Sequence, residues 1–150
     1  MKKCLLFLML FSRMLLAQAQ EVNPVVWLFS ANKIADKTYE VHLKATVQCP
    51  WTIYSQTTPE GGSLTTMIRF HKNPLVSFTG KPKEVGQLKK KHDDVFEVNV
   101  HYYKNSVEFV QVGKIKGSAK TAVSGTVEFM PCNEEQCLPP RELPFTVKIE

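Results

Sequence analysis

The stretch Met130-Pro131-Cys132-Asn133-Glu134-Glu135-Gln136-Cys137-Leu138-Pro139-Pro140 joins two segments in which apolar and polar residues alternate. Alternation with a period of two is typical of a β-strand with one buried face. One proline precedes the first cysteine and two follow the second, and each proline ring restricts the backbone. The sequence therefore predicts two strands joined by a stiff connection that carries both thiols.

A disulfide between Cys132 and Cys137 would close a ring of six residues. The chain-entropy relation gives so short a loop only about 2 kcal/mol of stabilisation. A bridge that contributes so little to the fold is better explained by its chemistry. Thiol–disulfide exchange needs an exposed sulfur, a ring that tolerates opening and a second thiol to resolve the mixed disulfide. Glu134 and Glu135 should disfavour thiolates here, which fits a domain activated by its partner.

Two other readings of the pair stay open at this point. In the first interpretation, the disulfide is a structural clip across a hairpin. In the second the thiols bind a metal, but a metal site needs two more ligands, and the four histidines show no paired spacing.

Residues 1–19 have the features of a secretory signal peptide: a basic start, an apolar run and an Ala-x-Ala cleavage site. Cleavage after Ala19 removes Cys4 and leaves one domain, residues 20–150, in a compartment where disulfides persist. Cys49, Cys132 and Cys137 then remain. We expect Cys49 to be a buried or half-buried thiol at the end of a strand; the alternative is a third redox role, because Cys49 lies just before Trp51.

Charge gives no sign of a nucleic-acid partner. The formal net charge of the whole chain is +5, from 19 basic and 14 acidic side chains. Without the three basic residues of the signal peptide, 16 bases face 14 acids, a net charge of +2. The run Lys89-Lys90-Lys91 is followed closely by two aspartates, and we expect it to be a solvated loop.

The rest of the chain predicts an all-β protein. Strands are expected at residues 25–30, 39–47, 51–55, 64–70, 75–78, 96–102, 106–115, 123–129 and 143–149, and residues 81–94 are expected to be charged and irregular. No amphipathic stretch is long enough for a helix. Regularly punctuated short strands of this kind favour an antiparallel β-sandwich.

Two blocks of sequence carry a resemblance to a known family. They are Trp51-Thr52-Ile53-Tyr54-Ser55-Gln56 and the segment from Gly125-Thr126-Val127-Glu128-Phe129 through both cysteines to Leu138-Pro139-Pro140. With these blocks the chain resembles the N-terminal periplasmic domain of DsbD, the thiol:disulfide interchange protein, and its stand-alone relatives, the disulfide bond corrector proteins. The resemblance implies an immunoglobulin-like antiparallel β-sandwich with redox cysteines on a hairpin.

The resemblance also implies a function. Such a domain is a periplasmic electron relay that works without cofactor or metal. It receives electrons from a membrane-embedded thiol reductase and passes them to thioredoxin-like or disulfide isomerase proteins. The expected partners are separate chains, and we expect a monomer.

By the same resemblance, Cys137 forms the mixed disulfide with the partner and Cys132 resolves it. Tyr54 matches an aromatic residue that shields the pair, Trp51 stands beside it in the block, and Phe96 is the candidate for a cap loop. The alternative for Trp51 and Tyr54 is a purely structural place in the core. Thr52 departs from the pattern, because members of the family can carry a second tyrosine there. The alternative function is a secreted immunoglobulin-like binding module whose disulfide is purely structural.

Overall fold

A computed structural model describes residues 22–61, 64–94, 97–117 and 120–149. The predicted signal peptide lies outside these ranges. Within them every regular element is a β-strand, and no helix is long and apolar enough to cross a membrane. The strands are β1 (Val25–Ala35), β2 (Thr38–Val47), β3 (Ile53–Tyr54), β4 (Met67–Phe70), β5 (Val76–Phe78), β6 (Lys83–Gly86), β7 (Lys89–Asp93), β8 (Val98–Tyr103), β9 (Ser106–Ile115), β10 (Thr121–Phe129) and β11 (Arg141–Ile149).

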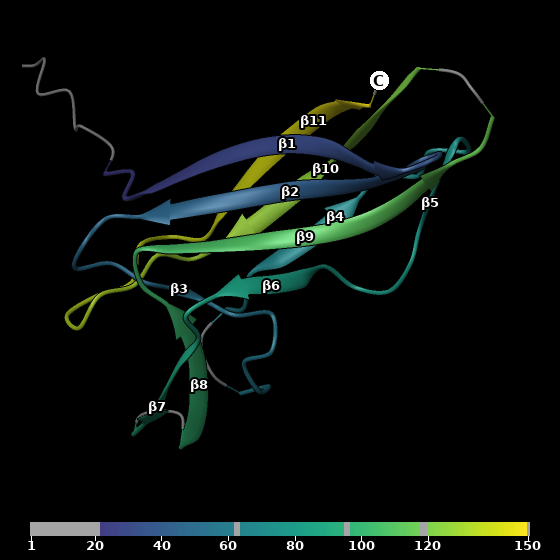
Figure 1. Cartoon of the computed structure of the whole chain (residues 1–150). Helices are drawn as coiled ribbons and strands as arrows, with labels where there is room; N and C mark the ends of the chain where they lie inside the picture. The colour runs from purple at the N-terminus through teal and green to yellow at the C-terminus, as the bar shows by residue number, and fades with distance from the viewer. Residues whose placement is uncertain (1–21, 62–63, 95–96, 118–119, 150) are drawn as a thin grey trace, which may run out of the picture.

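Two antiparallel sheets face each other across the core (Figure 1). The first has the order β1-β2-β9-β5, and β6 pairs with a further part of β9. The second has the order β11-β10-β4. A small third sheet, β3-β8-β7, projects from one end of the sandwich, at the same end as the connection between β10 and β11 (Figure 1). The predicted β-sandwich is confirmed.

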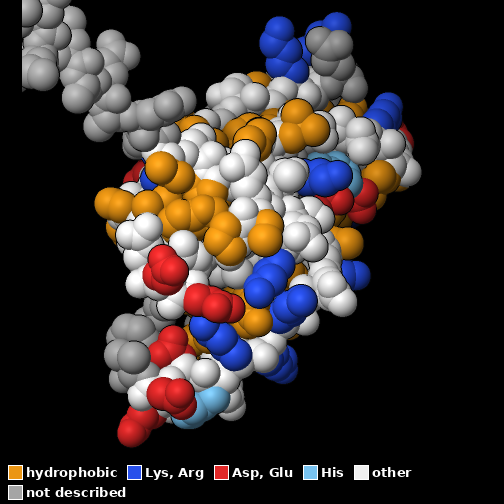
Figure 2. All heavy atoms as spheres, turned by 90° about the vertical axis from the view of Figure 1, so that its left-hand side faces the viewer, with side chains coloured by type: hydrophobic (Ala, Val, Ile, Leu, Met, Phe, Trp, Pro, Cys, Tyr) orange, Lys and Arg blue, Asp and Glu red, His pale blue; other side chains and the backbone are white. Residues whose placement is uncertain are grey.

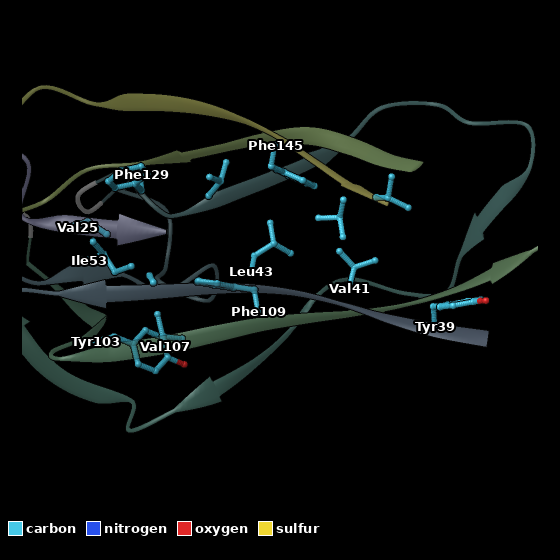
Figure 3. Close-up of a cluster of buried hydrophobic side chains, with 14 of the residues drawn as sticks. Val25, Tyr39, Val41, Leu43, Ile53, Tyr103, Val107, Phe109, Phe129 and Phe145 are labelled. Atoms are coloured by element: carbon cyan, nitrogen blue, oxygen red, sulfur yellow. The ribbon is translucent and has the colours of Figure 1, made fainter. Parts of the chain in front are cut away.

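The core between the two large sheets follows the alternation read from the sequence. On β2 the inward positions are all buried, namely Tyr39, Val41, Leu43, Ala45 and Val47. Side chains from β9, β10 and β11 meet them, among them Phe109, Phe129 and Phe145 (Figure 3). Full burial of one such side chain contributes about 1.5–3 kcal/mol. The sandwich thus has a source of stability that is independent of any disulfide.

The prediction of an irregular segment at residues 81–94 is wrong, because β6 and β7 lie within it. Both strands are set by backbone pairing with a better-patterned neighbour, β6 with β9 and β7 with β8. Most of their side chains are exposed, so no apolar alternation marks them in the sequence. The lysine run that we expected to be a loop is the start of β7.

Candidate functional site

The two cysteines lie on a hairpin that extends beyond the last paired residues of β10 and β11, Phe129 and Arg141. The Leu138 N–H donates to the Pro131 carbonyl oxygen at 2.8 Å, and the Asn133 N–H donates to the Gln136 carbonyl at 2.9 Å. The Asn133 side chain closes the tip, since its Oδ1 accepts from the N–H groups of residues 135 and 136 at 2.9 and 2.8 Å. Asparagine is favoured at turns for this ability to bond the backbone two residues on. The tip is therefore a tight turn with both glutamates at its corner.

Cys132 and Cys137 face each other across this hairpin and are joined by a disulfide. The hydrogen bonds on either side of them are those of the pairs 131/138 and 133/136, so the cysteines occupy the non-hydrogen-bonded position between them. Opposite residues approach most closely at such a position. Their Cα atoms are 4.0 Å apart. The turn therefore sets the register that brings the two sulfurs together.

The two cysteines differ sharply in their surroundings. Cys132 is 2% exposed. Its backbone exchanges two hydrogen bonds with Thr52, at 2.8 and 3.0 Å, and its carbonyl also accepts from the Thr52 hydroxyl at 3.1 Å. Cys137 is exposed on the outer arm of the hairpin, and no described residue is hydrogen-bonded to its backbone. One sulfur thus belongs to a buried residue and the other to a residue at an open edge.

Tyr54 contributes to the cover over Cys132. Tyr54 is 5% exposed and forms a small buried cluster with Cys132 and Val100. Half-buried residues complete this cluster, namely Val98, Tyr102 and Met130. The cluster is separate from the main core. Its residues come from the small third sheet and from the hairpin, so it joins the two. Tyr54 reaches it because it pairs with Tyr102 on β8.

The other residues expected at the site lie in different places. Trp51 is half-buried and packs against the main core, not in the cluster around Cys132. Phe96 lies outside the described residues. The pairing of Thr52 with Cys132 was not predicted from the sequence. Backbone hydrogen bonds form with any residue type except proline as donor, so the sequence carries no signal for this pairing.

Cys49 is exposed, so the expectation of a buried or half-buried thiol is wrong. The chain leaves β2 after Val47 and turns at once. This turn is closed by the Trp51 N–H, which donates to the Gln48 carbonyl at 2.8 Å. Cys49 lies at the corner of the turn, and its side chain projects into solvent.

A carboxylate behind the site anchors the strand that carries Tyr54. Glu84 on β6 accepts hydrogen bonds from the Ser55 hydroxyl at 2.6 Å, the Tyr103 hydroxyl at 2.7 Å and the Gln56 N–H at 2.7 Å. Burial and the hydrogen bond to Glu84 raise the pKa of Tyr103 well above its usual range. Tyr103 therefore stays neutral and keeps donating at any physiological pH.

A small hollow also adjoins the hairpin. It has a volume of about 60 Å³ and is lined by Pro50, Thr52, Tyr54, Lys91, Tyr102, Lys104, Asn133 and Glu134. In the described parts of the chain, this hollow included, no three His, Cys, Asp or Glu side chains gather as a metal site would require. The chemistry that this end of the molecule offers is that of the disulfide and of the charged groups beside it.

No protein-family model matches the sequence, and no curated protein matches it significantly. Solved structures do match. The DsbD N-terminal domain of Neisseria meningitidis in the reduced form is 16% identical, with a TM-score of 0.53 over 81% of this chain and 84% of that one. A structure of the complex between the DsbD and PilB N-terminal domains of the same organism gives 14% identity and a TM-score of 0.56 over 85% and 87%.

The N-terminal periplasmic domain of ScsB from Proteus mirabilis is also similar, at 14% identity and a TM-score of 0.54. That match covers 83% of this chain and 51% of the ScsB chain. The resemblance inferred from the two sequence blocks is thereby confirmed at the level of the fold: the chain has the immunoglobulin-like β-sandwich of the DsbD N-terminal domains.

Proposed function

We propose that this protein is an exported thiol–disulfide exchange domain that relays electrons through Cys132 and Cys137. The observation that carries the proposal is the asymmetry of the pair. Cys132 is buried and held by Thr52, whereas Cys137 is exposed on an open strand edge. Exchange needs one sulfur that a partner can reach and one that is kept nearby to resolve the adduct.

The exchange steps follow from this geometry. In the reduced domain the Cys137 thiolate attacks one sulfur of the partner's disulfide, forming a mixed disulfide and releasing the partner's other sulfur as a thiolate. The Cys132 thiolate then attacks Cys137 Sγ, breaks the mixed disulfide and releases the partner's second sulfur. Two electrons and two protons pass to the partner, and the Cys132–Cys137 disulfide remains. A membrane thiol reductase restores the dithiol by the reverse exchange.

The edge at Cys137 also suits docking. In a non-hydrogen-bonded pair the N–H and C=O groups of both residues point away from each other. Those of Cys137 therefore point out of the hairpin, where an extended segment of a partner can add as a further strand. The neighbouring Pro139 and Pro140 are exposed and restrict the backbone.

We infer periplasmic partners of the thioredoxin-like or disulfide isomerase kind. One of the similar structures is that of a complex between the DsbD and PilB N-terminal domains of Neisseria meningitidis, and another is the N-terminal periplasmic domain of ScsB. The signal peptide predicted at residues 1–19 supports export to the same compartment, and Tyr54 supports the site by covering Cys132.

The reduction potential of the pair tests this proposal. Structural disulfides of exported proteins lie below about −300 mV, and exchanging ones lie higher. Equilibration of the mature protein with a series of thiol redox buffers, read by alkylation and mass spectrometry, gives the value. A potential below about −300 mV would instead favour a binding module with a structural clip.

A further inference from the structure

We propose that the hollow beside the hairpin, between Lys91 and Lys104, accepts a carboxylate that flanks the reactive cysteine of the partner protein. This inference rests on the proposed function and adds a charge preference to it. The end of the molecule that faces the viewer in Figure 2 shows a group of basic side chains, with acidic side chains beside it, below an apolar patch.

Two strands bring the basic groups together. Lys91 lies on β7 and Lys104 directly follows β8. The Nζ atom of each lysine is 6.0 Å from the centre of the Tyr102 ring, so both ammonium groups flank one aromatic side chain. A cation over an aromatic ring at an exposed site gains only about 0.5–1 kcal/mol. The ring attracts both ammonium groups weakly and does not neutralise their charge.

Neither ammonium group is matched by a carboxylate within the described residues, where the ion pairs involve His42, Arg69 and His92 instead. Glu134 is the one acidic residue that lines the hollow, against two lysines, so the lining carries a net charge of +1. Lys89 shares the face of β7 with Lys91 and adds to the positive side, whereas Asp93 on that face and the exposed Glu135 at the hairpin tip oppose it.

The hollow is placed to act on exchange. Asn133 and Glu134 line it and belong to the ring that the disulfide closes. Tyr54 lines it as well and packs against Cys132. An anionic side chain next to a cysteine bound to Cys137 would therefore lie within reach of the two lysines. Such complementarity mainly raises the rate of encounter and selects among partners.

The reaction for the test is the opening of the oxidised domain. The thiolate of a peptide cysteine attacks Cys137 Sγ and forms a mixed disulfide. The bond between the two Sγ atoms breaks, Cys132 leaves as a thiolate and takes a proton from water. Two probe peptides are used, identical except that the cysteine is flanked by two glutamates in one and two glutamines in the other.

The rate of mixed-disulfide formation is measured by acid quench, alkylation and mass spectrometry. Three proteins are compared: the parent, the double variant Lys91→Gln/Lys104→Gln, and the control Lys114→Gln/Lys116→Gln. The control removes two exposed lysines away from the hairpin: Lys114 lies within β9 and Lys116 directly follows it. All three carry Cys49→Ser, because Cys49 is exposed. Comparison of the Glu-to-Gln rate ratio between proteins cancels the intrinsic difference between the peptides.

We expect the Glu-to-Gln rate ratio to fall roughly three- to tenfold in Lys91→Gln/Lys104→Gln at low salt, and to stay unchanged in the control. The difference should shrink at high ionic strength, because exposed charges are screened. An equal ratio in the parent and in Lys91→Gln/Lys104→Gln overturns the inference and leaves exchange intact. An equal fall in the control also overturns it, since net charge would then explain the effect. Failure of both peptides to open the parent disulfide overturns the inference together with the proposed function.

Discussion

Replacement of Tyr54 by alanine should open a route to Cys132. The tyrosine is 5% exposed and packs on Cys132, which is itself 2% exposed. Burial of a large side chain contributes about 1.5–3 kcal/mol. If most of that is lost on truncation, the local opening that exposes Cys132 becomes easier by the same amount. Since each 1.4 kcal/mol is a factor of ten, the buried thiol should react roughly ten to one hundred times faster.

The assay is alkylation of the reduced protein under native conditions, with the modified cysteine identified by mass spectrometry. Ile53→Ala is the matched control, because Ile53 is the neighbouring residue of β3 and is fully buried, but in the main core. Both variants lose a buried side chain, and only one loses the cover over Cys132. Equal acceleration in the two variants, or none in Tyr54→Ala, would refute the reasoning. Phe96→Ala tests the predicted cap loop in the same assay.

Three further predictions concern stability and thiol content. Reduction of the disulfide should lower the free energy of unfolding by about 2 kcal/mol and leave the protein folded; a thermal melt with and without reductant measures this, and loss of the transition on reduction would support the structural-clip reading. Glu84→Ala should cost about 3 kcal/mol or more in denaturant unfolding, because three donors lose their acceptor. The exposed Glu142→Ala should stay within about 0.5 kcal/mol, and a similar cost in both would contradict the anchoring role. The oxidised mature protein should react with one equivalent of a thiol reagent, at Cys49, and an unreactive Cys49 would contradict its exposure.

The parts of the fold that the sequence predicted are those in which burial dictates residue type. The alternation from Tyr39 to Val47 matches the buried face of β2 because only inward positions must be apolar. β6 and β7 were missed since their pairing depends on backbone hydrogen bonds that charged side chains form equally well.

The same distinction applies to the site. The cysteine pair and its hairpin could be predicted from the spacing and the prolines. The sequence did not predict the backbone hydrogen bonds between Cys132 and Thr52. Nor did it predict that Lys91 and Lys104 lie around Tyr102. The contact of Thr52 with Cys132 joins residues 80 positions apart in the chain. The two lysines reach Tyr102 through the pairing of β7 with β8, which no apolar alternation marks in the sequence.

The central claim is that Cys137 is the sulfur that meets the partner. Its most direct test compares Cys132→Ser with Cys137→Ser, both in a Cys49→Ser background, so that each protein keeps one thiol of the pair. Each is mixed with a thioredoxin-like protein that has a single active-site cysteine activated as a thionitrobenzoate disulfide. Release of thionitrobenzoate gives the rate, and a non-reducing gel shows the adduct.

We predict rapid formation of the adduct by Cys132→Ser, in which the exposed Cys137 remains. Cys137→Ser should react at least roughly tenfold more slowly, because its remaining thiol is buried and must first be exposed by local opening. Faster reaction of Cys137→Ser would assign the partner-binding role to Cys132. No adduct from either variant would contradict the exchange function itself.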